Sequence, residues 1–126
     1  MNFRLTNTSN MVFIYPALVA LLLQMYLAVF ISLGLLASSF VYHNNSEKKF
    51  LRFDLIFSVL AVSYNLYLCY LFNFNLIPFG VASVFLIVGL FSYLKAWKTK
   101  YAYYHTLWHI SCAAISVCCY MGYAFY

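Results

Sequence analysis

The sequence predicts an all-α membrane protein with four transmembrane helices, and three observations support this fold class. Of the 126 residues, 67% are hydrophobic and only 7% are charged, whereas about a quarter of the residues in an average soluble domain are charged. The hydrophobic residues form long uncharged runs of the length that a bilayer-spanning helix needs. Short segments containing Lys and Arg separate these runs. We therefore expect a single membrane domain over residues 1–126.

The first and longest apolar run extends from Met11 to Tyr42 without a charged residue. Pro16 suits the first turn of a helix, so we expect one helix over about residues 16–42. Such a helix would be about 40 Å long and could cross the bilayer when tilted. A cleaved signal peptide is the alternative, but its hydrophobic region spans only about 7–15 residues. We therefore expect the helix to be retained.

Three further runs predict the remaining helices, over about residues 54–75, 78–96 and 103–125. The second run begins at Asp54, the third follows the turn sequence NFNLIPFG, and the fourth extends nearly to the C-terminus. Each is near the roughly 20 residues that a spanning helix requires. The predicted architecture is therefore a four-helix membrane bundle.

Basic residues indicate how this bundle is oriented. They lie in or beside two of the segments between helices: Lys48, Lys49, Arg52, Lys95, Lys98 and Lys100. The opposite face carries only Arg4. Because Lys and Arg are enriched in cytoplasmic loops, we expect these two segments to be cytoplasmic and both termini to be non-cytoplasmic. Basic residues placed beside spans set topology, so no nucleic-acid partner is expected.

Polar residues follow one face of three of the predicted helices, at a spacing of 100° per residue. These residues are Ser32, Ser39 and His43 on the first helix, Asp54, Ser58 and Asn65 on the second, and His105, His109, Cys112 and Ser116 on the fourth. Lipid cannot form hydrogen bonds with such side chains. We therefore expect the three faces to turn towards one another or towards a water-filled cavity.

All three histidines and one of the two acidic residues are predicted at the same membrane depth. His43 ends the first helix, Asp54 begins the second, and His105 and His109 begin the fourth, so that all four lie at the cytoplasmic end. Ionisable side chains within membrane spans are costly and rare, and they commonly mark functional sites. This coincidence makes the four residues the leading candidates for a site.

Three neutral histidines with an open fourth position form a catalytic zinc site. His105 and His109 have the spacing that places two ligands on one metal ion, and His43 would complete the set from another helix. Asp54 is then placed to act as a general base, and Ser39, one turn before His43, could donate to a developing oxyanion. The combination predicts a zinc-dependent hydrolase.

The same residues resemble the pattern of the CREST superfamily, which includes alkaline ceramidases and adiponectin-receptor-type proteins. The resemblance lies in SFVYH, which contains Ser39 and His43, in RFDLIFSVLAVSYNL, which contains Asp54, and in HTLWH, which contains His105 and His109. The segments FDLIFSVLAVSYNLYL and YYHTLWHI are most similar to the branch of myomaker and the post-GPI-attachment lipase. The resemblance implies three histidine ligands for Zn²⁺, an Asp54–Ser39 pair around the activated water, and hydrolysis of an amide or ester bond in a lipid.

The chain departs from this superfamily in having four predicted spans where the family has seven. We expect it to be a shortened form, a fragment, or a chain whose missing helices come from a homodimer partner or another protein. Two other functions stay open: a non-catalytic membrane module of the myomaker type, and a haem protein in which His43 and either His105 or His109 are axial ligands.

Overall fold

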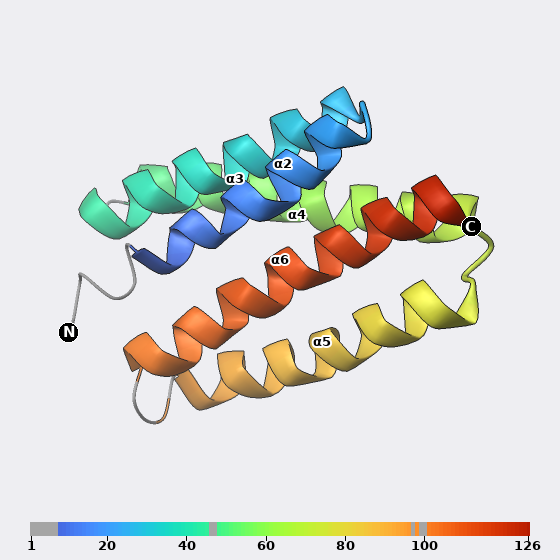
Figure 1. Ribbon diagram of the computed structural model, residues 1–126. Helices are drawn as coiled ribbons and strands as arrows, with labels where there is room; N and C mark the ends of the chain where they lie inside the picture. The colour runs from blue at the N-terminus through green and yellow to red at the C-terminus, as the bar shows by residue number, and fades with distance from the viewer. Residues whose placement is uncertain (1–7, 46–47, 97, 99–100) are drawn as a thin grey trace.

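The computed structural model describes residues 8–45, 48–96, 98 and 101–126, which form a bundle of helices (Figure 1). Within these residues, four helices are long and apolar enough to cross a membrane. They are α3 (Tyr26–Asn45), α4 (Lys48–Leu71), α5 (Leu76–Ala96) and α6 (Tyr101–Phe125). A shorter apolar helical segment, Thr8–Leu22, precedes them and contains the 3₁₀ turn η1 (Met11–Phe13) and α2 (Ile14–Leu22). The predicted all-α membrane fold with four candidate spans is confirmed.

The longest apolar run folds as a helical hairpin, so the single helix expected over residues 16–42 is wrong. Gln24, between α2 and α3, has a left-handed φ of 58°. The backbone amides of Gln24 and Met25 donate to the carbonyls of Leu21 and Ala20 at 3.0 and 2.8 Å, which is the Schellman arrangement that ends a helix. The left-handed conformation costs a residue other than glycine about 1–2 kcal/mol. The turn nevertheless allows both halves of an overlong run to pack within one bundle.

The helical segment before this turn begins at Thr8, ahead of the expected start at Pro16. The 3₁₀ turn η1 lies just before Pro16, where the missing N–H and the bulk of the proline ring disturb the regular α-helical pattern. The segment Thr8–Leu22 is about 22 Å long, which is shorter than the roughly 30 Å hydrocarbon core of a bilayer. It packs against α3 and α6 (Figure 1).

The hairpin also determines where the described part of the chain starts and ends. Near the start of the described chain, Ser9 is hydrogen-bonded to His109 close to the beginning of α6. The C-terminus follows the opposite end of α6 (Figure 1). Because the first run turns back at Gln24, the described chain starts and finishes at opposite ends of the bundle. Residues 1–7 lie outside the described residues, and the non-cytoplasmic placement of both termini stays a prediction.

The other helices lie close to their expected positions, with one difference that concerns the site. α4 begins at Lys48, so Asp54 lies in its second turn instead of opening the helix, and α4 ends at Leu71 instead of near residue 75. Asn73 and Phe74 follow with φ of 53° and 50°, and they form a second Schellman turn through the carbonyls of Tyr70 and Cys69.

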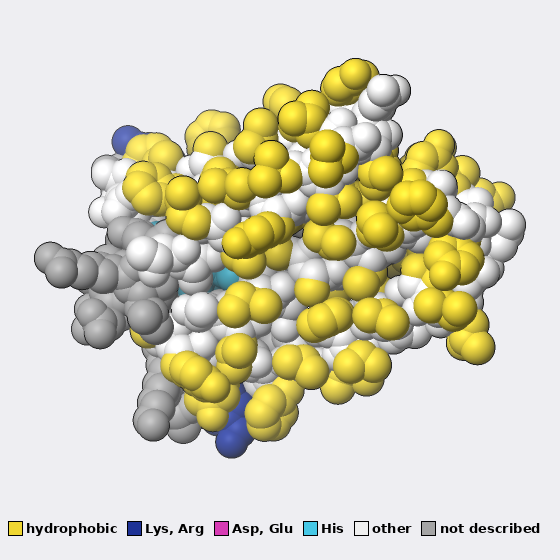
Figure 2. All heavy atoms as spheres, viewed as in Figure 1, with side chains coloured by type: hydrophobic (Ala, Val, Ile, Leu, Met, Phe, Trp, Pro, Cys, Tyr) yellow, Lys and Arg dark blue, Asp and Glu magenta, His cyan; other side chains and the backbone are white. Residues whose placement is uncertain are grey.

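The described basic residues Lys49, Arg52, Lys95 and Lys98 lie at the end of the bundle that holds the histidines, because α3 leads into α4 there and α5 leads into α6 (Figure 1). Figure 2 shows that hydrophobic side chains cover most of the visible face, as a lipid-facing surface requires. The Lys and Arg atoms visible in that view gather towards this same end. The sequence-based expectation that both basic segments share one membrane face agrees with this arrangement.

Interhelical hydrogen bonds show that the polar faces turn inward, as expected. The Nδ2 of Asn65 donates to the Oγ of Ser116 at 3.0 Å and connects α4 with α6. The hydroxyls of Ser32 and Tyr120 are 3.1 Å apart and connect α3 with α6. Ser58 instead donates to the carbonyl of Asp54 in its own helix.

Small residues allow α5 and α6 to approach closely, which is how transmembrane helices commonly pack. The buried face of α5 includes Ala82, Gly89, Ser92 and Ala96. A Cβ atom added at Gly89 would lie 2.9 Å from the Cβ of Ser111 and 3.3 Å from the ring of Trp108. Gly89 therefore sets the separation of the two helices near the middle of their contact.

Replacing Gly89 with leucine is expected to lower the free energy of unfolding by about 1–3 kcal/mol, because the added atoms overpack the contact between α5 and α6. Gly80→Leu on the same helix provides a control, since nothing lies within 4 Å of a Cβ added there. Equilibrium unfolding of both variants in detergent micelles measures the difference. Equal stability of the two variants would contradict the close packing at Gly89.

Candidate metal centre

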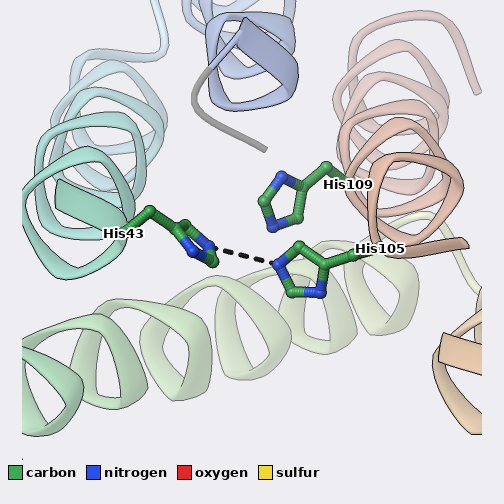
Figure 3. A group of neighbouring side chains, drawn as sticks. All are labelled: His43, His105 and His109. Atoms are coloured by element: carbon green, nitrogen blue, oxygen red, sulfur yellow. Dashed lines mark hydrogen bonds between the residues drawn. The ribbon is translucent and has the colours of Figure 1, made fainter. Parts of the chain in front are cut away.

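The three histidine side chains converge at one end of the bundle (Figure 3). His105 and His109 are one turn apart near the start of α6, which places both rings on the same face, with their centroids 4.4 Å apart. His43 approaches from the last turns of α3, and its ring centroid is 4.9 Å from that of His105 and 5.7 Å from that of His109. Residues that are far apart in the sequence thus form one compact cluster.

The spacing of the ring nitrogens fits a small metal ion. Each histidine can offer one nitrogen so that all three lie within 4.8 Å of one another, and the Nε2 atoms of His43 and His105 are 3.1 Å apart. Around a tetrahedral zinc ion with Zn–N bonds of about 2.0–2.1 Å, neighbouring ligand atoms are about 3.3 Å apart. The His43–His105 pair has nearly this separation, but the contact is a hydrogen bond (Figure 3) that a bound ion would replace.

Burial also suits the cluster to metal binding. His43 and His109 are each only 5% exposed, although imidazole is a polar group. Polar side chains buried in a membrane protein need partners, because lipid supplies no hydrogen bonds. Histidine nitrogens are among the preferred ligands of zinc, so the donor set fits the ion that the sequence predicts.

The N-terminal segment supplies two polar residues to this end of the bundle. The Oγ of Ser9 is 3.0 Å from the Nδ1 of His109. Asn10 is fully buried, and its Oδ1 accepts a hydrogen bond from the Oγ of Ser39 at 3.1 Å. Its Nδ2 has no hydrogen-bond partner among the described residues. Phe13 packs beside this segment, with its ring centroid 5.5 Å from that of His109.

Asp54 and Ser39 lie at the same end of the bundle but have different partners. The Oδ1 of Asp54 accepts a hydrogen bond from the Oγ of Ser38 at 3.2 Å, which connects α4 with α3. Ser39 is directed to Asn10 instead. Within the described residues, the group of candidate metal ligands contains the three histidines and not Asp54. This arrangement is compatible with a role for the carboxylate other than metal ligation.

An apolar groove with a volume of about 750 Å³ runs beside the cluster, between the N-terminal helical segment and α6. The residues that line it include Met11, Tyr15, Leu18, Leu107 and Ile110. The polar residues Ser9 and Thr106 are part of the same lining. Ser9 lines the groove and is hydrogen-bonded to His109, whereas the three histidines, Asp54 and Ser39 are not among the lining residues.

Sequence reasoning did not identify Ser9, Asn10 or Ser38 as part of this region. A helix that begins at Pro16 places the preceding polar residues outside the bundle. The sequence NTSN directly before the apolar run carried the missing signal, because consecutive polar residues at the start of a buried helix need partners. Ser38 adjoins Ser39, and the expected position of α3 alone did not indicate which serine would face Asp54.

Comparison of the chain with family models, curated proteins and solved structures finds no match. The fold and the histidine cluster are therefore described from this chain alone. The resemblance to the CREST superfamily stays a prediction from the short motifs that contain the three histidines, Asp54 and Ser39.

Proposed function

We propose that the protein is a zinc-dependent intramembrane hydrolase that cleaves an amide or ester bond in a lipid. The observation that carries this proposal is the cluster of His43, His105 and His109 at one end of a membrane bundle. The short Nε2–Nε2 separation of His43 and His105 favours a small ion over a porphyrin ring between these two histidines. A haem held by His43 and His109 stays an alternative to zinc.

The residues around the cluster would have separate tasks. Zinc, when bound, lowers the pKa of coordinated water to about 7 and polarises a carbonyl group. Asp54 would accept the proton of the attacking water as a general base. Ser39 would stabilise the developing negative charge on the substrate oxygen, and its bond to Asn10 would have to be exchanged for this contact.

The groove supports a lipid as the substrate class. Its lining is mainly apolar, and the polar residues Ser9 and Thr106 border the same space. Ligand sites are commonly concave and apolar with a few polar groups that orient the ligand. An acyl chain in the groove would lie beside Ser9, the lining residue whose hydroxyl contacts His109.

Replacing Ile110 with tryptophan is expected to narrow the groove and lower kcat/KM for a long-chain lipid, while the zinc content stays unchanged. Ile110 lines the groove and is not among the candidate ligands. Ile87→Trp is the matched control, because Ile87 is 68% exposed on α5 and does not line the groove. Hydrolysis of ceramide, phospholipid and glycolipid by the zinc-loaded proteins measures the effect.

The outcome separates an enzyme from a membrane module. Turnover by the parent and the Ile87 variant, with reduced turnover by the Ile110 variant, supports the proposed groove. Zinc binding without turnover of any of the three lipid classes by the parent would instead favour a non-catalytic module. This is the second candidate function, and it rests on the same histidine cluster.

We further propose that the histidine end of the bundle faces the cytoplasm, because the basic segments lie there and Lys and Arg are enriched on that side. A tag after Tyr126 should be accessible from outside sealed cells, whereas a tag inserted between residues 46 and 47 should require permeabilisation. Accessibility of the second tag in intact cells would contradict this orientation.

A further inference from the structure

We propose that Ser9 is a positioning residue for the metal centre, which holds the imidazole of His109 in the orientation and tautomer that zinc requires. This inference rests on the proposed function and deepens it. It assigns a role to an N-terminal segment that lies outside every motif from which the site was predicted. The observation behind it is the buried contact of 3.0 Å between the Oγ of Ser9 and the Nδ1 of His109.

A neutral histidine carries one ring proton, so a hydrogen bond at one nitrogen determines which nitrogen is left to bind a metal. His43 and His105 already approach each other through their Nε2 atoms. When the Nδ1–H of His109 donates to the Oγ of Ser9, the Nε2 of His109 keeps its lone pair for the ion. Metal-binding histidines almost always use their second nitrogen in this way.

Ser9 is held in place by its neighbour. Asn10 is fully buried and accepts a hydrogen bond from Ser39 on α3. The segment Ser9–Asn10 thereby connects α6, through His109, with α3, which carries His43. Ser9 is itself only 8% exposed, so water competes weakly for its contact with the imidazole. These contacts give the segment a defined position between the two helices that supply the ligands.

Two substitutions at Ser9 with side chains of the same shape test the contribution of the hydroxyl group. Ser9→Val and Ser9→Thr place side chains of similar size at the position, but only threonine keeps the hydroxyl. We expect Ser9→Val to weaken zinc binding by about 10–100-fold, the usual cost of removing the second hydrogen bond of a metal-binding histidine. We expect Ser9→Thr to keep most of the affinity. Ser92→Ala is the control, because the hydroxyl of buried Ser92 donates to the Val88 carbonyl of its own helix.

Zinc affinity is measured on the purified full-length proteins by competition with a chromogenic chelator. The visible spectrum of the Co²⁺-substituted proteins gives a second readout, because it responds to the arrangement of the ligands. A weaker affinity and an altered spectrum in Ser9→Val, with parent-like values for Ser9→Thr and Ser92→Ala, are the expected results. Should Ser9→Val and Ser9→Thr bind both ions as the parent does, the inference is wrong while the proposed zinc site stands. Failure of the parent to bind zinc would overturn both.

Discussion

Replacing His109 with alanine is expected to remove zinc from the protein. A three-ligand site keeps one position open for chemistry, so the loss of one histidine leaves only two protein ligands. His109 is 5% exposed, and its ring lies 4.4 Å from that of His105. Its position is therefore buried, and a side chain on the surface cannot replace it as a ligand. We expect the affinity to fall by more than about 100-fold, because loss of a mere hydrogen-bond partner of a ligand costs about 10–100-fold.

The zinc content of parent and variant after dialysis against a chelator measures this effect. Thr106→Ala is a suitable control, because Thr106 lies in the same turn of α6 and its hydroxyl donates to the carbonyl of Ala102 in that helix. The control should retain about one zinc ion per chain. Stoichiometric zinc in a His105→Ala/His109→Ala double variant would show that the metal lies elsewhere.

Replacing Asp54 with asparagine is expected to lower lipid hydrolysis by a factor on the order of 10²–10⁴, the usual contribution of general acid–base catalysis. Zinc should remain bound, because Asp54 is not among the candidate ligands. The substitution keeps the size of the side chain and an oxygen that can accept the hydrogen bond of Ser38. The proton acceptor is lost while the contact between α3 and α4 is preserved.

Single-turnover hydrolysis and zinc content, measured on the same preparations, test this assignment. Ser58→Ala is the matched control, because Ser58 lies one turn further along α4 and its hydroxyl donates to the Asp54 carbonyl. The control should hydrolyse lipid at close to the parent rate. Loss of zinc from Asp54→Asn would make Asp54 a ligand or a structural anchor, and an unchanged rate would remove it from catalysis.

The fold class and the grouping of the histidines could be predicted from the sequence because both depend on strong, repeated signals. Long uncharged runs indicate spans, and the histidines lie at span ends that alternate across the membrane. The spacing of His105 and His109 fixes their common face on a helix. These features survive errors in the helix bounds, which explains why the cluster forms although the first run folds as a hairpin.

The turn at Gln24 could not be predicted with the same rules. Helix ends are usually marked by glycine or proline, and neither occurs within LLLQMY. Gln24 is a polar residue in an apolar run, but one amide side chain does not distinguish a turn from a tilted helix. Tertiary packing of Thr8–Leu22 against α3 and α6 stabilises the left-handed residue, and this contribution lies outside any local pattern.

The hydrogen-bond partners of His109 and Ser39 also depend on the turn at Gln24. Only when the first run folds back do Ser9 and Asn10 reach His109 and Ser39. The sequence placed Ser39 one turn before His43, but it did not show that its hydroxyl is engaged by Asn10. Similarly, the neighbouring Ser38 is the one that meets Asp54, because the rotation of α3 against α4 is set by side-chain packing.

X-ray absorption at the zinc K edge tests the three-histidine site most directly. For the purified protein with one zinc ion per chain, we predict about three nitrogen neighbours at about 2.0–2.1 Å and one oxygen neighbour at a similar distance. The spectrum should show the multiple scattering of imidazole rings. A sulfur neighbour at about 2.3 Å would point to a cysteine ligand such as Cys112, one turn from His109, and would contradict a site made of His43, His105 and His109.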